Sequence, residues 1–150
     1  HKYIVVERNN EMGVCLTSKK SNYSFDMGYI GFNNLRANIA SAWDKELGEV
    51  YANTSMAILD QKKYNERINS ILADDRFKNE DKDIADFLFQ SDCEGKCGYK
   101  TCGKIYNLIK DIDFTGKIFT YAAYSDGKDY EYLKLFLKEC YKKRRMMIWY

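Results

Sequence analysis

The sequence predicts an α+β fold in which a small mixed or antiparallel sheet is covered by about four or five helices. Apolar residues recur at helical spacing along much of the chain, and short runs of β-branched and aromatic residues lie near both ends. The length of 150 residues matches one ordinary domain, and neither an internal repeat nor a low-complexity linker divides it. We therefore expect a single α+β domain over residues 1–150.

The first predicted strands form an N-terminal hairpin. Lys2–Glu7 has the composition of a strand, Arg8–Gly13 that of a turn, and Val14–Thr17 can return as the second arm. Phe25–Ile30 is expected to be either a short strand or an ordered loop.

Helices are predicted where apolar residues recur every three or four positions. The clearest has apolar residues at this spacing from Phe32 to Trp43, and Gly48 lies near its end. Similar spacing predicts helices at 64–72, around 84–88, at 99–112 and at 129–143. Residues 51–60 carry no decisive pattern, and 91–98 is expected to be a polar loop.

The end of the chain predicts a strand at 117–124, then the 129–143 helix, then a closing strand at 146–150. If the two strands are parallel neighbours in one sheet, the crossover between them should be right-handed.

Composition excludes several classes of protein. The formal charge is only +2, which argues against a protein that coats duplex nucleic acid or binds membranes through a polybasic surface. No apolar run reaches the roughly 18 residues of a membrane-spanning helix. The five cysteines are an odd number without a regular framework, so we expect free thiols and a cytoplasmic location.

Catalytic motifs are nearly absent from the sequence. The single histidine is His1, which removes histidine triads and histidine general bases, and there is no P-loop, GxGxxG or nucleophile elbow. Acid–base work by Asp92 with Glu94 is possible in principle, but nothing in the spacing singles it out. We therefore favour binding over catalysis and expect no metal or other cofactor.

Arg36 breaks the pattern of its helix, because it shares the apolar stripe of Phe32, Leu35 and Ile39. A guanidinium on an apolar face is costly unless it is paired. Two interpretations are open. In the structural one, Arg36 forms an ion pair or lies at the edge of the apolar face with its charged end in water; in the functional one, it contacts a ligand or partner.

The segment from Ser91 to Cys97 is rich in acids and admits several interpretations. Calcium is disfavoured because the first and twelfth places of an EF-hand register fall on Gln90 and Thr101, which carry no carboxylate. Zinc is disfavoured because the cysteine spacings match no finger or ribbon. We favour an acidic loop that anchors Arg36 through Asp92 or Glu94, or anchors a bound group, with Gly95 allowing the turn.

Aromatic and basic residues supply further candidates for binding. Aromatic side chains make up 15% of the chain and include Tyr29, Tyr121 and Tyr124, which are suited to stacking although most aromatic residues are expected in the core. The basic run Lys142–Arg145 follows a predicted helix, where it is either a solvated face that suits the helix dipole or a phosphate or protein contact.

Two of these motifs resemble a family of small, largely uncharacterised bacterial and phage-borne proteins. Met27–Arg36 is similar to the family's aromatic–small–x–x–Phe–x–x–Phe/Leu–Arg segment, and Ser91–Gly95 followed by Cys102 is similar to its Ser-Asp-Cys-Asp-Gly loop and downstream cysteine. Glu94 stands where the family usually has Asp, and Thr101 where it often has Glu. The resemblance implies that Arg36 pairs with Asp92, but it implies no biochemical function.

The leading functional hypothesis, by analogy with phage accessory proteins, is a phage counter-defence protein of the host cytoplasm. It would sequester a small nucleotide signal without catalysis and act as a homo-oligomer. The alternatives are a protein–protein inhibitor or adaptor of a host defence effector, and thirdly a small nucleotide-cleaving hydrolase. The candidate ligand-binding residues are Tyr29, Phe32, Asn33, Arg36, Asp92, Glu94, Tyr121, Tyr124, Lys142 and Arg144.

Overall fold

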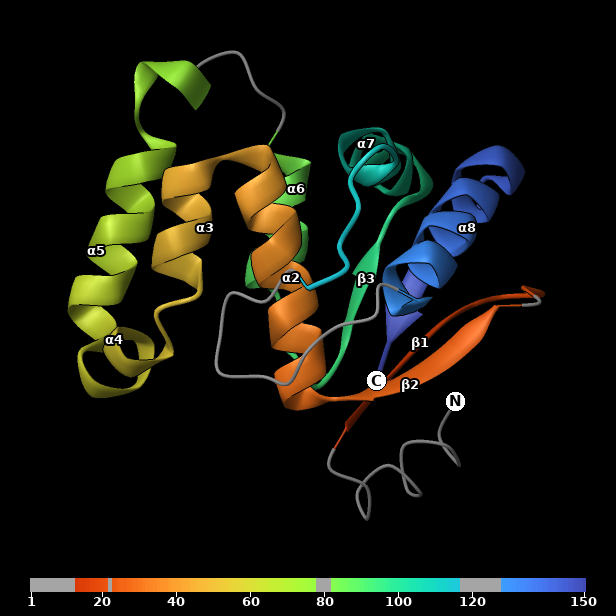
Figure 1. Ribbon diagram of the computed structural model, residues 1–150, viewed down its shortest axis with the longest axis horizontal. Helices are drawn as coiled ribbons and strands as arrows, with labels where there is room; N and C mark the ends of the chain where they lie inside the picture. The colour runs from red at the N-terminus through yellow and green to blue at the C-terminus, as the bar shows by residue number, and fades with distance from the viewer. Residues whose placement is uncertain (1–12, 22, 78–81, 117–127) are drawn as a thin grey trace.

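The computed structural model describes residues 13–21, 23–77, 82–116 and 128–150. The strands predicted at 2–7 and 117–124, and with them the predicted crossover, lie outside these residues. Over the described part, the α+β prediction is confirmed by a four-stranded antiparallel sheet and seven α-helices. Figure 1 shows α3, α4 and α5 on one side of α2, with the sheet, α7 and α8 on the other.

The sheet has the strand order β2–β1–β4–β3, so the last strand of the chain lies between two earlier ones. The strands are β1 (Gly13–Ser18), β2 (Ser24–Gly28), β3 (Gly95–Cys97) and β4 (Met147–Trp149). β4 pairs antiparallel with β1 through Leu16 opposite Trp149, and with β3 through Gly95 opposite the same Trp149. The predicted closing strand therefore pairs with one strand from the start of the described chain and one from its middle.

The hairpin involving β1 differs from the predicted one. Val14–Thr17 is a strand as expected, but it pairs with the later β2 across the turn from Ser18 to Ser21. The other edge of β1 is paired with β4 over residues 16–18. Of the two options for Phe25–Ile30, the structure shows a strand over residues 25–28, after which the chain enters α2.

The periodic segments form helices close to the predicted bounds. The helices are α2 (Tyr29–Trp43), α3 (Lys45–Tyr51), α4 (Thr54–Leu59), α5 (Gln61–Leu72), α6 (Asp83–Phe89), α7 (Tyr99–Ile109) and α8 (Lys128–Lys143), with a short 3₁₀ turn at Asp75–Phe77. No helix of the described residues combines the length and the apolar character needed to cross a membrane.

The first predicted helix ends earlier than expected, at Trp43 and not near Gly48, because Asp44 ends α2 and caps α3. From there through residues 51–60, which the apolar pattern left unassigned, the chain is divided into short helices by polar caps. The side chains of Asp44, Asn53 and Asp60 each accept a hydrogen bond from the backbone N–H three residues later. Such caps satisfy amide groups that have no partner inside the helix. The cap residues therefore decide where α3, α4 and α5 begin.

Trp149 links the sheet to the helices. Its ring lies 5.5 Å from the Phe32 ring and 5.6 Å from the Phe87 ring, measured between centroids, and its indole N–H donates to the Ser91 carbonyl at 2.9 Å. A methyl group on Gly95 would lie 2.1 Å from the indole. Gly95 is thus required by close packing inside β3, and the prediction that 91–98 is entirely loop was wrong over Gly95–Cys97.

Candidate functional site

Arg36 is held by backbone carbonyls at the end of α6. The residue is 5% exposed, and its Nη1 donates to the Gln90 carbonyl at 2.7 Å and to the Phe87 carbonyl at 3.3 Å. Its guanidinium carbon also lies 4.4 Å from the centroid of the Phe32 ring. A helix C-terminus carries partial negative charge, so this end of α6 is a suitable partner for a buried cation.

The predicted contact of Arg36 with Asp92 or Glu94 is therefore wrong. Neither carboxylate forms an ion pair or hydrogen bond with Arg36 in the described structure, and both side chains are exposed. The acceptors are backbone carbonyls at the end of α6, and because every residue carries one, the sequence gives no sign of this contact. Arg36 thus supports the fold by fastening α2 to the end of α6.

The acidic loop is closed by Gln90. Its side-chain amide donates to the Lys96 carbonyl at 2.7 Å and accepts from the Lys96 N–H at 2.9 Å. Inside the loop, Ser91 Oγ accepts from the N–H of Cys93 at 3.0 Å. These bonds, together with the hydrogen bond from the Trp149 indole to Ser91, occupy polar groups at the base of the loop. Asp92 and Glu94 lie at its tip, where both are exposed.

The described residues hold no cluster of three or more His, Cys, Asp or Glu side chains placed to bind a metal. All five cysteines are free thiols. Cys97, Cys102 and Cys140 are buried, with 3.8 Å between the sulfurs of Cys97 and Cys102. The hydrogen bond to Cys102 and burial raise the pKa of the Cys140 thiol, which is expected of core thiols that stay protonated.

A basic and aromatic cleft lies between α7 and the end of α8. Its volume is about 560 Å³, within the usual range for sites that bind small molecules. The described lining contains no carboxylate and consists of Tyr99, Lys100, Gly103, Lys104, Asn107, Tyr141, Lys142 and Arg144. We call this the α7–α8 cleft.

The aromatic part of the cleft depends on close packing at Gly103. A methyl group at this position would lie 2.5 Å from the Tyr141 ring, so only glycine lets that ring rest on α7. The centroids of Tyr99 and Tyr141 are 6.5 Å apart, with an angle of 32° between the ring planes. Tyr141 remains 50% exposed, which leaves ring surface free for a bound group.

Arg144 lies where the chain leaves α8, with a φ of 53°. The N–H of Arg145 donates to the Cys140 carbonyl at 2.9 Å, as in the left-handed caps that usually use glycine. An L side chain in this conformation costs roughly 1–2 kcal/mol. The fold therefore carries an exposed arginine in a backbone position that favours glycine.

The cations of the cleft differ in their partners. Lys104 lies 3.5 Å from Asp83, measured between Nζ and Oδ2. Lys100, Lys142 and Arg144 have no hydrogen-bond or ion-pair partner for their side chains among the described residues, and all three are exposed. These three positive charges are available to an anionic ligand.

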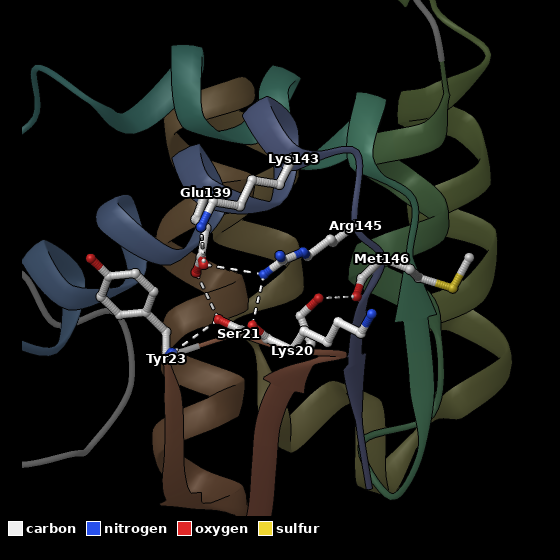
Figure 2. Close-up of polar contacts among 8 residues, drawn as sticks. Lys20, Ser21, Tyr23, Glu139, Lys143, Arg145 and Met146 are labelled. Atoms are coloured by element: carbon white, nitrogen blue, oxygen red, sulfur yellow. Dashed lines mark hydrogen bonds and ion pairs between the residues drawn. The ribbon is translucent and has the colours of Figure 1, made fainter.

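The neighbouring cations, Lys143 and Arg145, are instead bound by Glu139 (Figure 2). Glu139 lies 3.3 Å from Lys143 and 3.4 Å from Arg145, and it accepts from Ser21 Oγ at 2.7 Å. The Ser21 hydrogen bond, with Lys143 and Arg145, holds the pKa of Glu139 below its usual value although burial opposes the shift. The basic run is thus divided into charges used by the fold and charges left at the surface.

The structure separates the sequence-predicted candidates. Tyr29 and Asn33 are partly exposed on α2, Phe32 is buried, and Tyr121 and Tyr124 lie outside the described residues. Lys142 and Arg144 come together in the α7–α8 cleft.

Sequence reasoning missed the cleft residues contributed by α7, and it missed Tyr141. The available signal was the polar face of the predicted 99–112 helix, where Lys100, Lys104 and Asn107 lie opposite the apolar stripe.

No protein-family model, curated protein or solved structure matches this chain.

Proposed function

We propose that this chain is a non-enzymatic binding protein that holds a small nucleotide in the α7–α8 cleft. The observation that carries the proposal is the convergence of Lys100, Lys142 and Arg144, without partners among the described residues, beside the rings of Tyr99 and Tyr141. Lysine and arginine bind phosphate oxygens, and arginine binds them two at a time. A tyrosine face offers a stacking surface for the base.

Sequestration of a nucleotide signal in phage counter-defence is the biological role that we attach to this binding. It rests on analogy with phage accessory proteins, because the resemblance of Met27–Arg36 and Ser91–Gly95 to segments of bacterial and phage-borne proteins implies no biochemical function by itself. A sequestering protein needs affinity and an accessible site, and it needs no catalytic group. The absence of histidine after His1 is compatible with such a role.

Titration calorimetry against a panel of mononucleotides, linear dinucleotides and cyclic nucleotides tests the proposal. The double variant Lys100→Gln/Lys142→Gln should weaken binding of the best ligand at least tenfold. The matched control Lys62→Gln/Lys63→Gln removes the same charge from exposed positions on α5 and should bind like the wild type. Absence of heat with every ligand, or equal losses in both variants, would contradict the proposal.

The stacking contribution has its own test. Tyr141→Phe keeps the ring and should retain affinity, whereas Tyr141→Leu should weaken binding by about 1–3 kcal/mol, the usual contribution of a stacked base. The ratio of the two affinities isolates the ring from the hydroxyl. Equal affinity of the two variants would remove base stacking from the proposed mode of binding.

A second candidate, an inhibitor or adaptor that binds a protein, is favoured by one surface feature. Ile58 and Leu59 at the end of α4 are 79% and 83% exposed, and adjacent exposed aliphatic side chains are suited to a protein contact. Ile58→Ser/Leu59→Ser should abolish capture of a protein target while leaving nucleotide binding unchanged. Loss of nucleotide binding in this variant would place the ligand elsewhere than the α7–α8 cleft.

A further inference from the structure

A second basic hollow adjoins the α7–α8 cleft and shares one residue with it. Its volume is about 390 Å³, and it lies between the β1–β2 turn and the start of β4. Lys19, Lys20, Arg144, Arg145, Met146 and Ile148 line it, so Arg144 belongs to both sites. We call this second site the turn hollow.

We infer that the two hollows form one continuous binding surface for a single-stranded ligand with phosphates on both sides of Arg144, such as a linked dinucleotide or a short oligonucleotide. This inference rests on the nucleotide binding proposed above and extends it to the substrate class. One nucleotide unit would occupy the α7–α8 cleft, the linking phosphate would meet Arg144, and the next unit would lie in the turn hollow.

Backbone conformation gives the first support. Among the described residues, Lys20 and Arg144 are the non-glycine residues with positive φ, at 60° and 53°. Both are basic and both line the turn hollow. Glycine or asparagine would fit either backbone position at lower cost. Two independent departures from that preference thus place cations in the same hollow.

The distribution of partners gives the second support. Arg145 Nη1 donates to the Lys20 carbonyl at 2.8 Å and contacts Glu139, while Ser18 Oγ donates to the Met146 carbonyl at 2.8 Å. These bonds fasten the β1–β2 turn to the end of α8, so Lys20 and Arg144 are fixed on one framework. Figure 2 shows the Lys20 side chain directed away from Glu139.

The turn hollow also has the mixed character that a nucleotide unit requires. Lys19, Lys20 and Arg144 have no side-chain partner among the described residues, whereas Met146 is 46% exposed and offers apolar surface. Phosphates would meet the cations, and a base or sugar would lie against Met146 and Ile148. Single strands are the fitting class because their bases are free to contact protein surfaces, unlike those of a duplex.

The experiment compares three ligands of increasing length by calorimetry or fluorescence anisotropy: a 5′-mononucleotide, a 5′-phosphorylated dinucleotide, and a single-stranded pentanucleotide. The test variant is Lys19→Gln/Lys20→Gly, which removes both charges of the turn and places the residue that its backbone favours at position 20. We expect it to stay folded, to bind the mononucleotide like the wild type, and to bind the longer ligands about tenfold more weakly.

Salt dependence provides a second readout. Each phosphate contact with a single strand contributes about 0.7 to the slope of log affinity against log salt. The test variant should therefore lower that slope by about 0.7–1.4 for the pentanucleotide and leave it unchanged for the mononucleotide. The control Lys62→Gln/Lys63→Gln, distant in sequence on α5, should alter neither.

The outcomes separate the two proposals. If the mononucleotide binds through the α7–α8 cleft but the longer ligands gain nothing and the test variant binds all three normally, the continuous surface is refuted while nucleotide binding stands. If the wild type binds none of the three ligands, both proposals fail. If the test variant loses mononucleotide binding as well, the turn hollow is the primary site and the assignment of units is overturned.

Discussion

Arg36 and Arg144 both stand where local rules disfavour arginine, but their surroundings differ. Arg36 is buried on an apolar helix face, where its Nη1 donates to two carbonyls at the end of α6 and its guanidinium lies over the Phe32 ring, while its Nε has no hydrogen-bond partner in the described structure. Arg144 is exposed on a backbone that favours glycine, and nothing in the described structure satisfies its guanidinium. An unusual residue indicates a compensating interaction, and only the structure shows whether that interaction is internal or left for a ligand.

The largest expected effect concerns the packing that surrounds Arg36. Trp149→Ala removes the ring on which Phe32 and Phe87 pack and leaves a cavity, so it should lower the free energy of unfolding by about 3–5 kcal/mol. Urea denaturation followed by circular dichroism measures this loss. The exposed control Tyr141→Ala should cost much less, and equal losses would contradict the central position of Trp149 in the core.

Replacing Arg36 itself tests whether its role is internal. Arg36→Met keeps the length of the side chain but loses the bonds to Phe87 and Gln90, and should cost about 2–3 kcal/mol of unfolding free energy. Arg67→Met on exposed α5 is the matched control and should change stability little. Nucleotide affinity of folded Arg36→Met should equal that of the wild type, because Arg36 does not line the α7–α8 cleft. If Arg36→Met kept normal stability but lost nucleotide affinity, Arg36 would be a ligand-binding residue and its internal role would be refuted.

Arg144→Gly should move stability and affinity in opposite directions. Glycine accepts the left-handed backbone without steric cost, so the free energy of unfolding should rise by roughly 1 kcal/mol. The affinity for the best nucleotide should fall about tenfold, since a charged contact to phosphate is lost. Thermal denaturation and calorimetry on the same preparation check both. A variant that is less stable, or that binds normally, would show that Arg144 is retained for the fold.

Periodicity predicted most helices because it records which face each helix buries, and α2, α5, α7 and α8 follow it closely. It could not predict pairings set by distant segments, such as the insertion of β4 between β1 and β3. The error at Arg36 has a related cause, since its partners are backbone carbonyls, which every residue carries.

The candidate site was predicted only in part for the same reason. The charge run at the end of α8 identified Lys142 and Arg144. Their neighbours Tyr99 and Lys100 lie about forty positions earlier and join them because Gly103 packs closely on Tyr141.

The smallest expected effect concerns Glu139, the carboxylate that pairs with Lys143 and Arg145. Its folded-state pKa lies below its unfolded value, so its stabilising contribution is complete above the unfolded pKa, near 4.5, and is lost as the pH falls through the folded value. The contribution should be at most about 1 kcal/mol, as for ion pairs near a surface.

Denaturant titrations of the wild type and Ser21→Ala between pH 6 and pH 3 measure this loss. Ser21→Ala removes the hydrogen bond that contributes most to lowering the pKa of Glu139, so its stability should depend less steeply on pH in the acid range. Protonation of Glu139 also removes the ion pairs of Lys143 and Arg145, which leaves their positive charge unneutralised beside the turn hollow, while Arg145 keeps its hydrogen bond to the Lys20 carbonyl. Binding of the pentanucleotide should therefore be unchanged between pH 6 and pH 4.5 and strengthen slightly as the pH falls further, through the folded-state pKa of Glu139, provided that the ligand phosphodiesters stay ionised. A weaker complex at the lower pH would show that Glu139 supports the turn hollow more than it competes for its cations.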